Sequence, residues 1–222
     1  MVLVKTGDSS YTYLNKGVGE TYHSVSGGFE EAFGKFVIPS TMVKLCSRGF
    51  TVFDVCFGLG YNSAAALHFF LEHFSKGGFM ELVGFENDRQ ILNKIASIEV
   101  PEFIEDAYSP IRLLVKELHN GKPCVKSDIF SLRLDFGDAR VRIIQERRKA
   151  NIVLFDPFSP KRAPDMWSYE FLKTIYNKME RGGVLTTFSC ARVTRENLKR
   201  CGFRVSNGPR IGRKAPSTIA VK

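Results

Sequence analysis

Acidic side chains stand at the ends of several short apolar runs, beside turns that contain glycine or proline. The four acids that share this placement, each with its apolar run, are Asp54 within 51–57, Glu86 after 80–85, Asp138 after 130–136 and Asp156 after 152–155. Gly58 and Gly60 follow the first run, and two glycines allow a ligand to approach the backbone closely. A carboxylate at a strand end can accept hydrogen bonds from both hydroxyls of a ribose. These residues together predict a site for a ligand that contains a nucleoside.

The negative charge of Asp54 helps to decide which nucleoside-containing ligand the site would bind. Gly58-x-Gly60-x-x-Ser63 approximates the fingerprint of a dinucleotide-binding loop. Such a loop would bring a pyrophosphate close to Asp54, and the two negative groups would repel each other. A cationic nucleoside cofactor such as S-adenosylmethionine tolerates the carboxylate, so the pattern favours that ligand. A plain β–α turn that binds nothing is the alternative.

The four acids need elements that bring the strand ends to one place. Apolar runs alternate with helix-like stretches, which predicts a parallel, doubly wound α/β sheet of Rossmann-like type. The expected strands are 51–57, 80–85, 130–136, 152–155, 184–188, 203–205 and 218–221, and the expected helices are 62–74, 88–97, 138–149, 168–179 and 192–200. Ligands of such sheets bind at the carboxyl ends of the strands, where the acids stand.

The N-terminal part has a different pattern. Residues 2–37 are expected to form short strands with turns. Within them, residues 2–4 and 11–14 flank a turn at 7–10 and predict a β-hairpin, and a short helical stretch follows at about 39–46. We therefore expect a small β-rich extension over 1–48 and the main domain over 49–222. Residues 99–127 read as an insertion over the sheet, with a helix at 111–118.

Composition sets the broad class of protein. The chain has 222 residues, 44% of them hydrophobic, which is enough for one sizeable core. The first residues do not match a signal peptide, and no apolar run approaches the roughly 18 residues that span a bilayer. Five scattered cysteines indicate neither a disulfide framework nor a zinc site. We expect a cytoplasmic protein, monomeric, without a metal or a membrane partner.

The charge balance favours a polyanionic partner. Lys and Arg outnumber Asp and Glu by 32 to 23, for a formal net charge of +9. A basic surface suits nucleic acid, although many basic proteins bind none. The net charge alone does not decide whether this protein binds nucleic acid.

The order of the strand ends resembles that of class I S-adenosylmethionine-dependent methyltransferases. Nearly the whole chain also resembles the methyltransferase domain of the bifunctional family that makes 5-methylaminomethyl-2-thiouridine at the tRNA wobble position. The matching segments are Gly19–Ser24, Gly28–Glu31, Phe57–Asn62, Asp156–Pro160, Ala163–Trp167, Cys201–Phe203 and Gly212–Lys214. Cys56 and Pro157 stand where the resemblance implies glycine, and no length remains for the flavin oxidase domain of that family.

The resemblance implies a fold, a cofactor and a reaction. The fold is a seven-stranded, mostly parallel sheet with the N-terminal extension, and the cofactor is S-adenosylmethionine. The reaction is N-methylation of 5-aminomethyl(-2-thio)uridine to the 5-methylaminomethyl form, with the aminomethyl base accepted directly. The residues expected to bind the cofactor are Asp54, Gly58, Gly60, Asn62, Glu86, Asp138, Tyr22, Glu31 and Phe158. Tyr22 and His23 could close over the cofactor from the N-terminal segment, although a lone histidine is more often structural. Asp138 could face the adenine amino group of the cofactor or serve only as a helix N-cap.

Asp156 is the candidate catalytic residue. Methyl transfer to an amine is an in-line displacement, for which the protein supplies proximity and orientation. The carboxylate of Asp156 can accept a hydrogen bond from the amine and take its proton as charge develops. Phe158 can stack on the target base or pack against the cofactor. A simple turn aspartate is the alternative for Asp156.

Basic residues after the strand ends and in the tail suit the phosphates of a tRNA anticodon stem-loop. The residues expected on the RNA side are Lys161, Arg162, Trp167, Arg192, Arg195, Arg213 and Lys214. Trp167 is either a platform for a base or a core residue. Two other functions remain possible. One is that of an aminopropyltransferase related to spermidine synthase, and the other is that of a non-catalytic RNA-binding protein with the same Rossmann-like fold.

Overall fold

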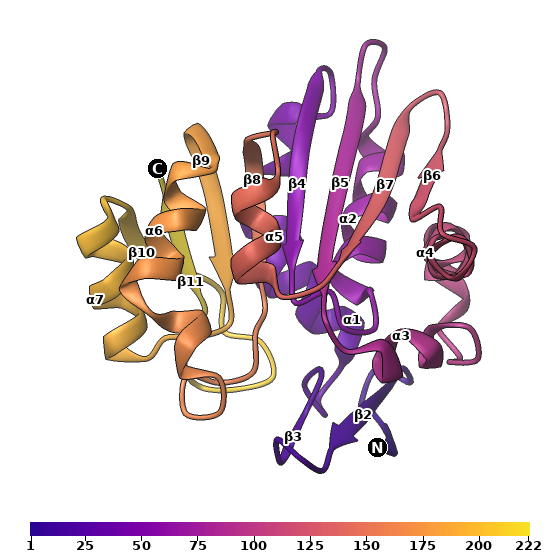
Figure 1. The fold of residues 1–222 in the computed structure, drawn as a ribbon, viewed down its shortest axis with the longest axis horizontal. Coiled ribbons are helices and arrows are strands. Elements are labelled where there is room, and N and C mark those ends of the chain that lie inside the picture. The colour runs from indigo at the N-terminus through magenta and orange to yellow at the C-terminus, as the bar shows by residue number, and fades with distance from the viewer.

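The main body of the protein is an eight-stranded sheet with helices on both faces. The computed structural model describes residues 1–222, and the strand order is β10-β11-β9-β8-β4-β5-β7-β6 (Figure 1). The five strands β4 (Gly49–Val55), β5 (Phe79–Glu86), β7 (Phe130–Phe136), β8 (Ala150–Phe155) and β9 (Met179–Thr187) pair in parallel. The strands β6 (Cys124–Lys126), β10 (Arg204–Asn207) and β11 (Thr218–Val221) join by antiparallel pairing. The expected α/β methyltransferase-type fold is confirmed, with eight strands instead of seven because β6 adds a short edge.

Two hydrophobic clusters lie on the two faces of the sheet. Alternate residues of β4 point to opposite faces, so Val52 belongs to one cluster and Phe53 to the other. Helices α2 (Tyr61–His73), α3 (Arg89–Ile95) and α4 (Glu105–His119) cover the first face, and α5 (Ala139–Gln145), α6 (Tyr169–Asn177) and α7 (Arg192–Cys201) cover the second (Figure 1). Burial on both faces explains why the central strands are continuous apolar runs.

Residues 99–127 form α4 and β6. The helix is longer than the expected 111–118, and Ile111 and Leu114 are completely buried in the first cluster. This segment therefore covers the sheet beside α2. No helix in the structure combines the length and apolar character needed to cross a bilayer.

The N-terminal residues form a separate small sheet. Its strands β1 (Val2–Lys5), β2 (Tyr11–Asn15) and β3 (Glu20–Thr21) are antiparallel, and the pairing of Val2 with Leu14 confirms the expected hairpin. This sheet lies next to the carboxyl ends of the central strands (Figure 1). It is placed to cover whatever binds at those ends.

The expectation of strands and turns up to residue 37 is wrong for 28–37. Helix α1 (Gly28–Glu31) continues into a π-helical stretch, Ala32–Val37, followed by 3₁₀ turns at Ile38–Ser40 and Met42–Leu45. Phe29, Ala32 and Phe36 are at most 1% exposed, and their spacing gives the segment one buried face. Because these side chains belong to the core of the main sheet, residues 28–37 connect the two sheets. The division of domains at residue 48 stays a prediction.

Candidate functional site

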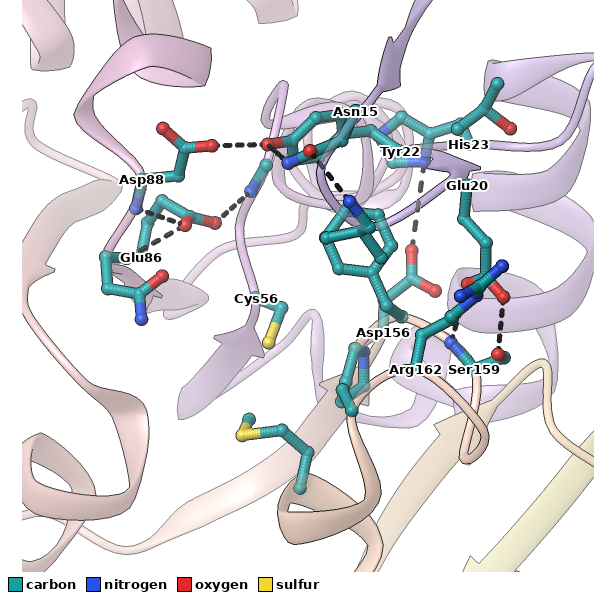
Figure 2. Close-up of a pocket in the computed structure, with 18 of the residues that line it drawn as sticks. Asn15, Glu20, Tyr22, His23, Cys56, Glu86, Asp88, Asp156, Ser159 and Arg162 are labelled. Carbon is teal, nitrogen blue, oxygen red and sulfur yellow. Dashed lines mark hydrogen bonds and ion pairs between the residues drawn. The ribbon is translucent and has the colours of Figure 1, made fainter.

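A cavity of about 800 Å³ lies between the small N-terminal sheet and the carboxyl ends of the central strands. Its wall carries six carboxyl groups and a single arginine, Arg162. Figure 2 shows Arg162 together with Glu20, Glu86, Asp88 and Asp156 around the cavity. The six acids are Glu20, Glu31, Glu86, Asp88, Asp138 and Asp156. A wall with this charge suits a ligand that bears positive charge.

The loop after β4 forms one side of the cavity. Gly58 and Gly60 have φ angles of +56° and +75°, and Cys56 has a φ of +67°. Cys56 thus occupies the left-handed region in which glycine is most favourable. At Gly60 a Cβ would lie 2.7 Å from Cγ2 of Ile111. Close packing as well as φ therefore requires glycine at this position.

Glu86 holds the loop in place. Its Oε2 accepts a hydrogen bond from the backbone N–H of Gly58 at 2.8 Å, and its Oε1 accepts from those of Asn87 and Asp88 at 2.8 and 2.7 Å. Burial raises the pKa of Glu86, and these hydrogen bonds act in the opposite direction. Glu86 lines the cavity. Its position is compatible with a contact between its carboxylate and a ribose, which stays a prediction.

Asp54, Gly60 and Asn62 do not line the cavity. Asp54 is 0% exposed, and its Oδ2 accepts a hydrogen bond from the Ser63 hydroxyl at 2.6 Å. Burial raises the pKa of Asp54 to about 7. Asn62 donates from Nδ2 to Oδ2 of Asp156 at 2.9 Å. The structure therefore places these residues behind the surface that a ligand would touch, and their direct contact with a cofactor stays a prediction.

Asp156 follows β8 and lines the cavity. Its carboxyl lies 3.8 Å from Nδ1 of His23, measured from Oδ2 (Figure 2). Burial raises the pKa of Asp156 well above its ordinary value, and the nearby Glu31 raises it further. A carboxylate with a raised pKa is a stronger proton acceptor than an exposed aspartate.

His23 is the site residue whose placement depends most on the tertiary fold. Its ring stacks on Tyr61 with centroids 4.8 Å apart, and it is 6% exposed. Burial lowers the pKa of His23 to about 4, so the imidazole is neutral near pH 7. Neither ring nitrogen has a hydrogen-bond partner.

Glu31, beside His23, is held on two sides. Its Oε1 accepts from the buried Lys35 ammonium at 2.6 Å, and its Oε2 accepts from the backbone N–H of Ser24 at 2.8 Å. The side chain lines the cavity. Contact between Glu31 and a cofactor amine stays a prediction.

Tyr22 and Glu20 tie the N-terminal segment to the main body across the cavity. Tyr22 donates its hydroxyl to Asp88 (Figure 2). The ring of Tyr22 lies 5.1 Å from that of Phe158, measured between centroids. On the other side Glu20 accepts from the backbone N–H of Ser159 at 2.9 Å. Sequence reasoning missed Glu20 and Ser159, because nothing local marks either residue. Asp88 is also the N-cap of α3, since its Oδ1 accepts from the N–H of Gln90 at 2.8 Å.

Asp138 is the N-cap of α5. Its Oδ1 accepts from the backbone N–H of Arg140 at 2.9 Å, and the Arg140 guanidinium beside it lowers the pKa of this carboxyl. Asp138 also lines the cavity. The capping alternative is thus present, and contact with an adenine stays a prediction.

Trp167 lies in the core and not on a surface that could hold a base. It is 2% exposed, and its ring packs against those of Phe155 and Phe188. Its Nε1 donates to the carbonyl of Phe158 at 2.9 Å. The structure therefore favours the core alternative, in which Trp167 supports the loop that carries Phe158.

The basic residues expected on the RNA side divide into two groups. Arg195 donates to Thr218, Asn207 and the carbonyl of Ser217, and Arg213 donates to the carbonyl of Phe188, so both stabilise the C-terminal segment. Lys161, Arg162, Arg192 and Lys214 are exposed without such bonds to the C-terminal segment, and Arg192 pairs with Glu196. Arg213 is exposed as well. The structure has no cluster of three or more His, Cys, Asp or Glu side chains that could hold a metal ion, and its five cysteines are free.

The sequence of this chain is similar to one protein family and to several known proteins. Residues 100–222 match a family described as S-adenosyl-L-methionine-dependent methyltransferase. An uncharacterized protein of Methanocaldococcus jannaschii is 37% identical over 100% of this chain and 59% of its own length. The tRNA 5-methylaminomethyl-2-thiouridine biosynthesis bifunctional protein MnmC of Azoarcus sp. is 29% identical over 88% of this chain and 32% of its own length. This chain therefore spans only part of these relatives.

A solved structure is similar over almost the whole chain. The crystal structure of MnmC2 from Aquifex aeolicus superimposes with a TM-score of 0.84 and is 33% identical, covering 98% of this chain and 69% of that one. The similarity includes both the N-terminal sheet and the main sheet, because the coverage is nearly complete.

Proposed function

The chain belongs to the S-adenosyl-L-methionine-dependent methyltransferase family, and from this premise we propose that it methylates the amine of 5-aminomethyl(-2-thio)uridine at the tRNA wobble position. The observation that carries the proposal is the buried carboxyl of Asp156, which faces the cavity beside a neutral histidine. Such a group suits an amine that must lose a proton during transfer. The likeness to MnmC2 and to the MnmC proteins supports this choice of substrate.

The cofactor of the family is S-adenosyl-L-methionine, and the residues of the cavity fit it. The acidic wall complements the sulfonium and the amino group of this cofactor. We assign the cofactor to the wall formed by Gly58, Glu86 and Asp138, with Tyr22 and Phe158 covering it. The cofactor supplies the activated methyl group, and this chain supplies position and proton transfer.

The proposed work of the protein is to orient a neutral amine and take its proton. Asp156 accepts a hydrogen bond from the amine, whose lone pair then faces the methyl group. Burial raises the pKa of Asp156, which makes its carboxylate a stronger base, and the positive charge of the sulfonium favours the ionised form. The small sheet excludes water, because Glu20 and Tyr22 fix it to the main body.

We assign the tRNA to the side of the cavity marked by Lys161 and Arg162. Both are exposed, and Arg162 also lines the cavity. Phosphate contacts from these side chains would give affinity without choosing a sequence. The proposal leaves Trp167 with a structural role.

Mass spectrometry of tRNA nucleosides tests the proposal. Purified protein and cofactor are incubated with an anticodon stem-loop that carries 5-aminomethyluridine, and one added methyl group is expected. The same RNA with unmodified uridine is the control and gains no methyl. An aminomethyl RNA that stays unmethylated would refute the substrate assignment. Incubation with decarboxylated cofactor and putrescine tests aminopropyl transfer, for which we expect no product.

A further inference from the structure

The buried side chain of His23 has hydrogen-bonding capacity that the protein does not use. It lines the cavity and is 6% exposed, and neither Nδ1 nor Nε2 has a partner. The residue is firmly placed, because its ring stacks on Tyr61 and its backbone N–H donates to the Thr12 hydroxyl at 3.0 Å. Buried polar atoms are almost always hydrogen-bonded. The unused nitrogens therefore indicate a polar group of a ligand.

The position of His23 relative to Asp156 indicates which group that is. Nδ1 of His23 and Oδ2 of Asp156 are 3.8 Å apart, too far for a good hydrogen bond between them. An N–H donor in the cavity can reach both residues at ordinary hydrogen-bond distances. The Oδ1 atom of Asn62 is also unpartnered, but Asn62 does not line the cavity.

The protonation state of His23 makes it an acceptor. Burial lowers the pKa of the imidazole to about 4, although the charges of Glu31 and Asp8 act in the opposite direction. A neutral imidazole has one nitrogen with a free lone pair. With the proton on Nε2, the lone pair of Nδ1 lies on the side of Asp156. In this tautomer the cavity offers two acceptors side by side, one from the segment after β3 and one from the residue after β8.

A neutral primary amine has two N–H groups and one lone pair, which matches these two acceptors. When both N–H groups are held, the lone pair has one direction left, toward the methyl donor. We infer that His23 and Asp156 each hold one N–H of the substrate amine, and that this pair of acceptors limits the enzyme to a single methyl transfer. The inference rests on the proposed function.

The atoms of the reaction explain the limit. The new N–C bond forms as the S–C bond of the sulfonium breaks, its electron pair stays on sulfur, and Asp156 takes one amine proton. The product is a secondary amine with one N–H. A second transfer would place the new methyl against one acceptor and leave that buried acceptor without a donor, which slows the transfer at least about tenfold.

Substitutions of His23 in the full chain test this inference. The substrates are two anticodon stem-loops, one with 5-aminomethyluridine and one with 5-methylaminomethyluridine, and the products are measured by mass spectrometry of nucleosides. His23→Ala removes the acceptor and leaves space, while His23→Asn keeps an acceptor oxygen. His119→Ala, an exposed histidine outside this cavity, is the matched control. Calorimetric binding of the cofactor checks that each variant is folded, and His23→Ser replaces alanine if that variant binds none.

We expect the wild type and the His119 variant to methylate the second RNA at least about tenfold more slowly than the first. The alanine variant should methylate the first RNA at least about tenfold more slowly than the wild type does, and it should convert the second RNA to the dimethylated base faster than the wild type does. The asparagine variant should form less dimethylated base than the alanine variant. Equal wild-type rates on the two RNAs would overturn the inference, as would a second transfer that is no faster than wild type in every His23 variant that binds cofactor.

Two further results are decisive. Equal dimethylation by the asparagine and alanine variants would overturn the inference, because lost volume and not the lost acceptor would then set the limit. A wild type that leaves the first RNA unmethylated would refute the proposed function, and the inference with it. Failure of the inference alone is recognised by normal wild-type activity with unchanged products in the variants.

Discussion

Replacing Asp54 by asparagine should stabilise the protein at neutral pH. The carboxyl is 0% exposed, and burial raises its pKa from 3.8 to about 7 against the opposing hydrogen bond from Ser63. Between roughly pH 4 and pH 7 the native state therefore holds a proton that the unfolded chain has released. Because the unfolded state binds fewer protons in this window, the free energy of unfolding falls as the pH rises.

The size of the effect follows from the shift. One unit of pKa difference corresponds to about 1.4 kcal/mol, and at pH 7 the native carboxyl has itself begun to ionise. Wild-type stability therefore falls by roughly 2 kcal/mol between pH 5 and pH 7 through this group. The asparagine variant lacks this loss, and its amide oxygen can accept from the Ser63 hydroxyl as Oδ2 of Asp54 does. The stability of the variant relative to wild type should therefore improve by roughly 2 kcal/mol over the same interval.

Urea unfolding of wild type and variant at pH 5 and pH 7 measures the difference. Asp128→Asn is the matched control, because it makes the same chemical change at an exposed position, and it should shift stability equally at both pH values. A relative stability of Asp54→Asn that is the same at pH 5 and pH 7 would refute the reasoning. Since Asp54 lies outside the cavity wall, we expect cofactor affinity within about threefold of wild type. A tenfold loss would restore Asp54 as a direct ligand.

Three further changes test the site. Asp156→Asn should lower kcat by about 10²- to 10⁴-fold while calorimetric cofactor affinity stays unchanged, and lost affinity would instead assign Asp156 to the cofactor. Trp167→Phe should lower the free energy of unfolding by about 1–3 kcal/mol, because it removes the bond to the Phe158 carbonyl; an unchanged urea midpoint with weakened RNA binding would contradict the core role. Alanine at both Lys161 and Arg162 should weaken tRNA binding and reduce its dependence on salt by about two phosphate contacts, and an unchanged salt slope in filter binding would move the RNA elsewhere.

The acids at the strand ends could be predicted from sequence because topology places them. Alternation of strands and helices fixes a parallel sheet, and a parallel sheet brings Glu86, Asp138 and Asp156 to one edge without knowledge of any contact. The structure places all three on the cavity wall. Asp54 stands one residue before the end of β4, and its side chain is turned to Ser63 instead. The strand pattern thus predicts that these acids lie at the carboxyl ends of the parallel strands, but it does not predict where each side chain points.

The contribution of the N-terminal sheet could not be predicted in the same way. Glu20 and Ser159 are separated by 139 positions in the chain, and no local pattern relates them. Their contact depends on how residues 28–37 pack, and the glycines at positions 27, 28 and 34 conceal the helical character of that segment. The π-helical stretch and the unused nitrogens of His23 therefore become visible only in the folded chain.

The net charge of the chain overstates the basic surface available to RNA. Arg195 and Arg213 donate to the C-terminal segment, so they stabilise the fold whether or not RNA binds. Exposed cations nevertheless stand in two segments. Lys161 and Arg162 follow β8, and Arg162 lines the cavity. The tail that carries Lys214 lies near the N-terminal segment, because Gly212 is close to Ser26. Under the proposed function, a nucleotide of a strand brings a phosphate on each side of its base, so we expect Lys161 and Arg162 to contribute more to the binding of an RNA strand than to the binding of a free nucleoside.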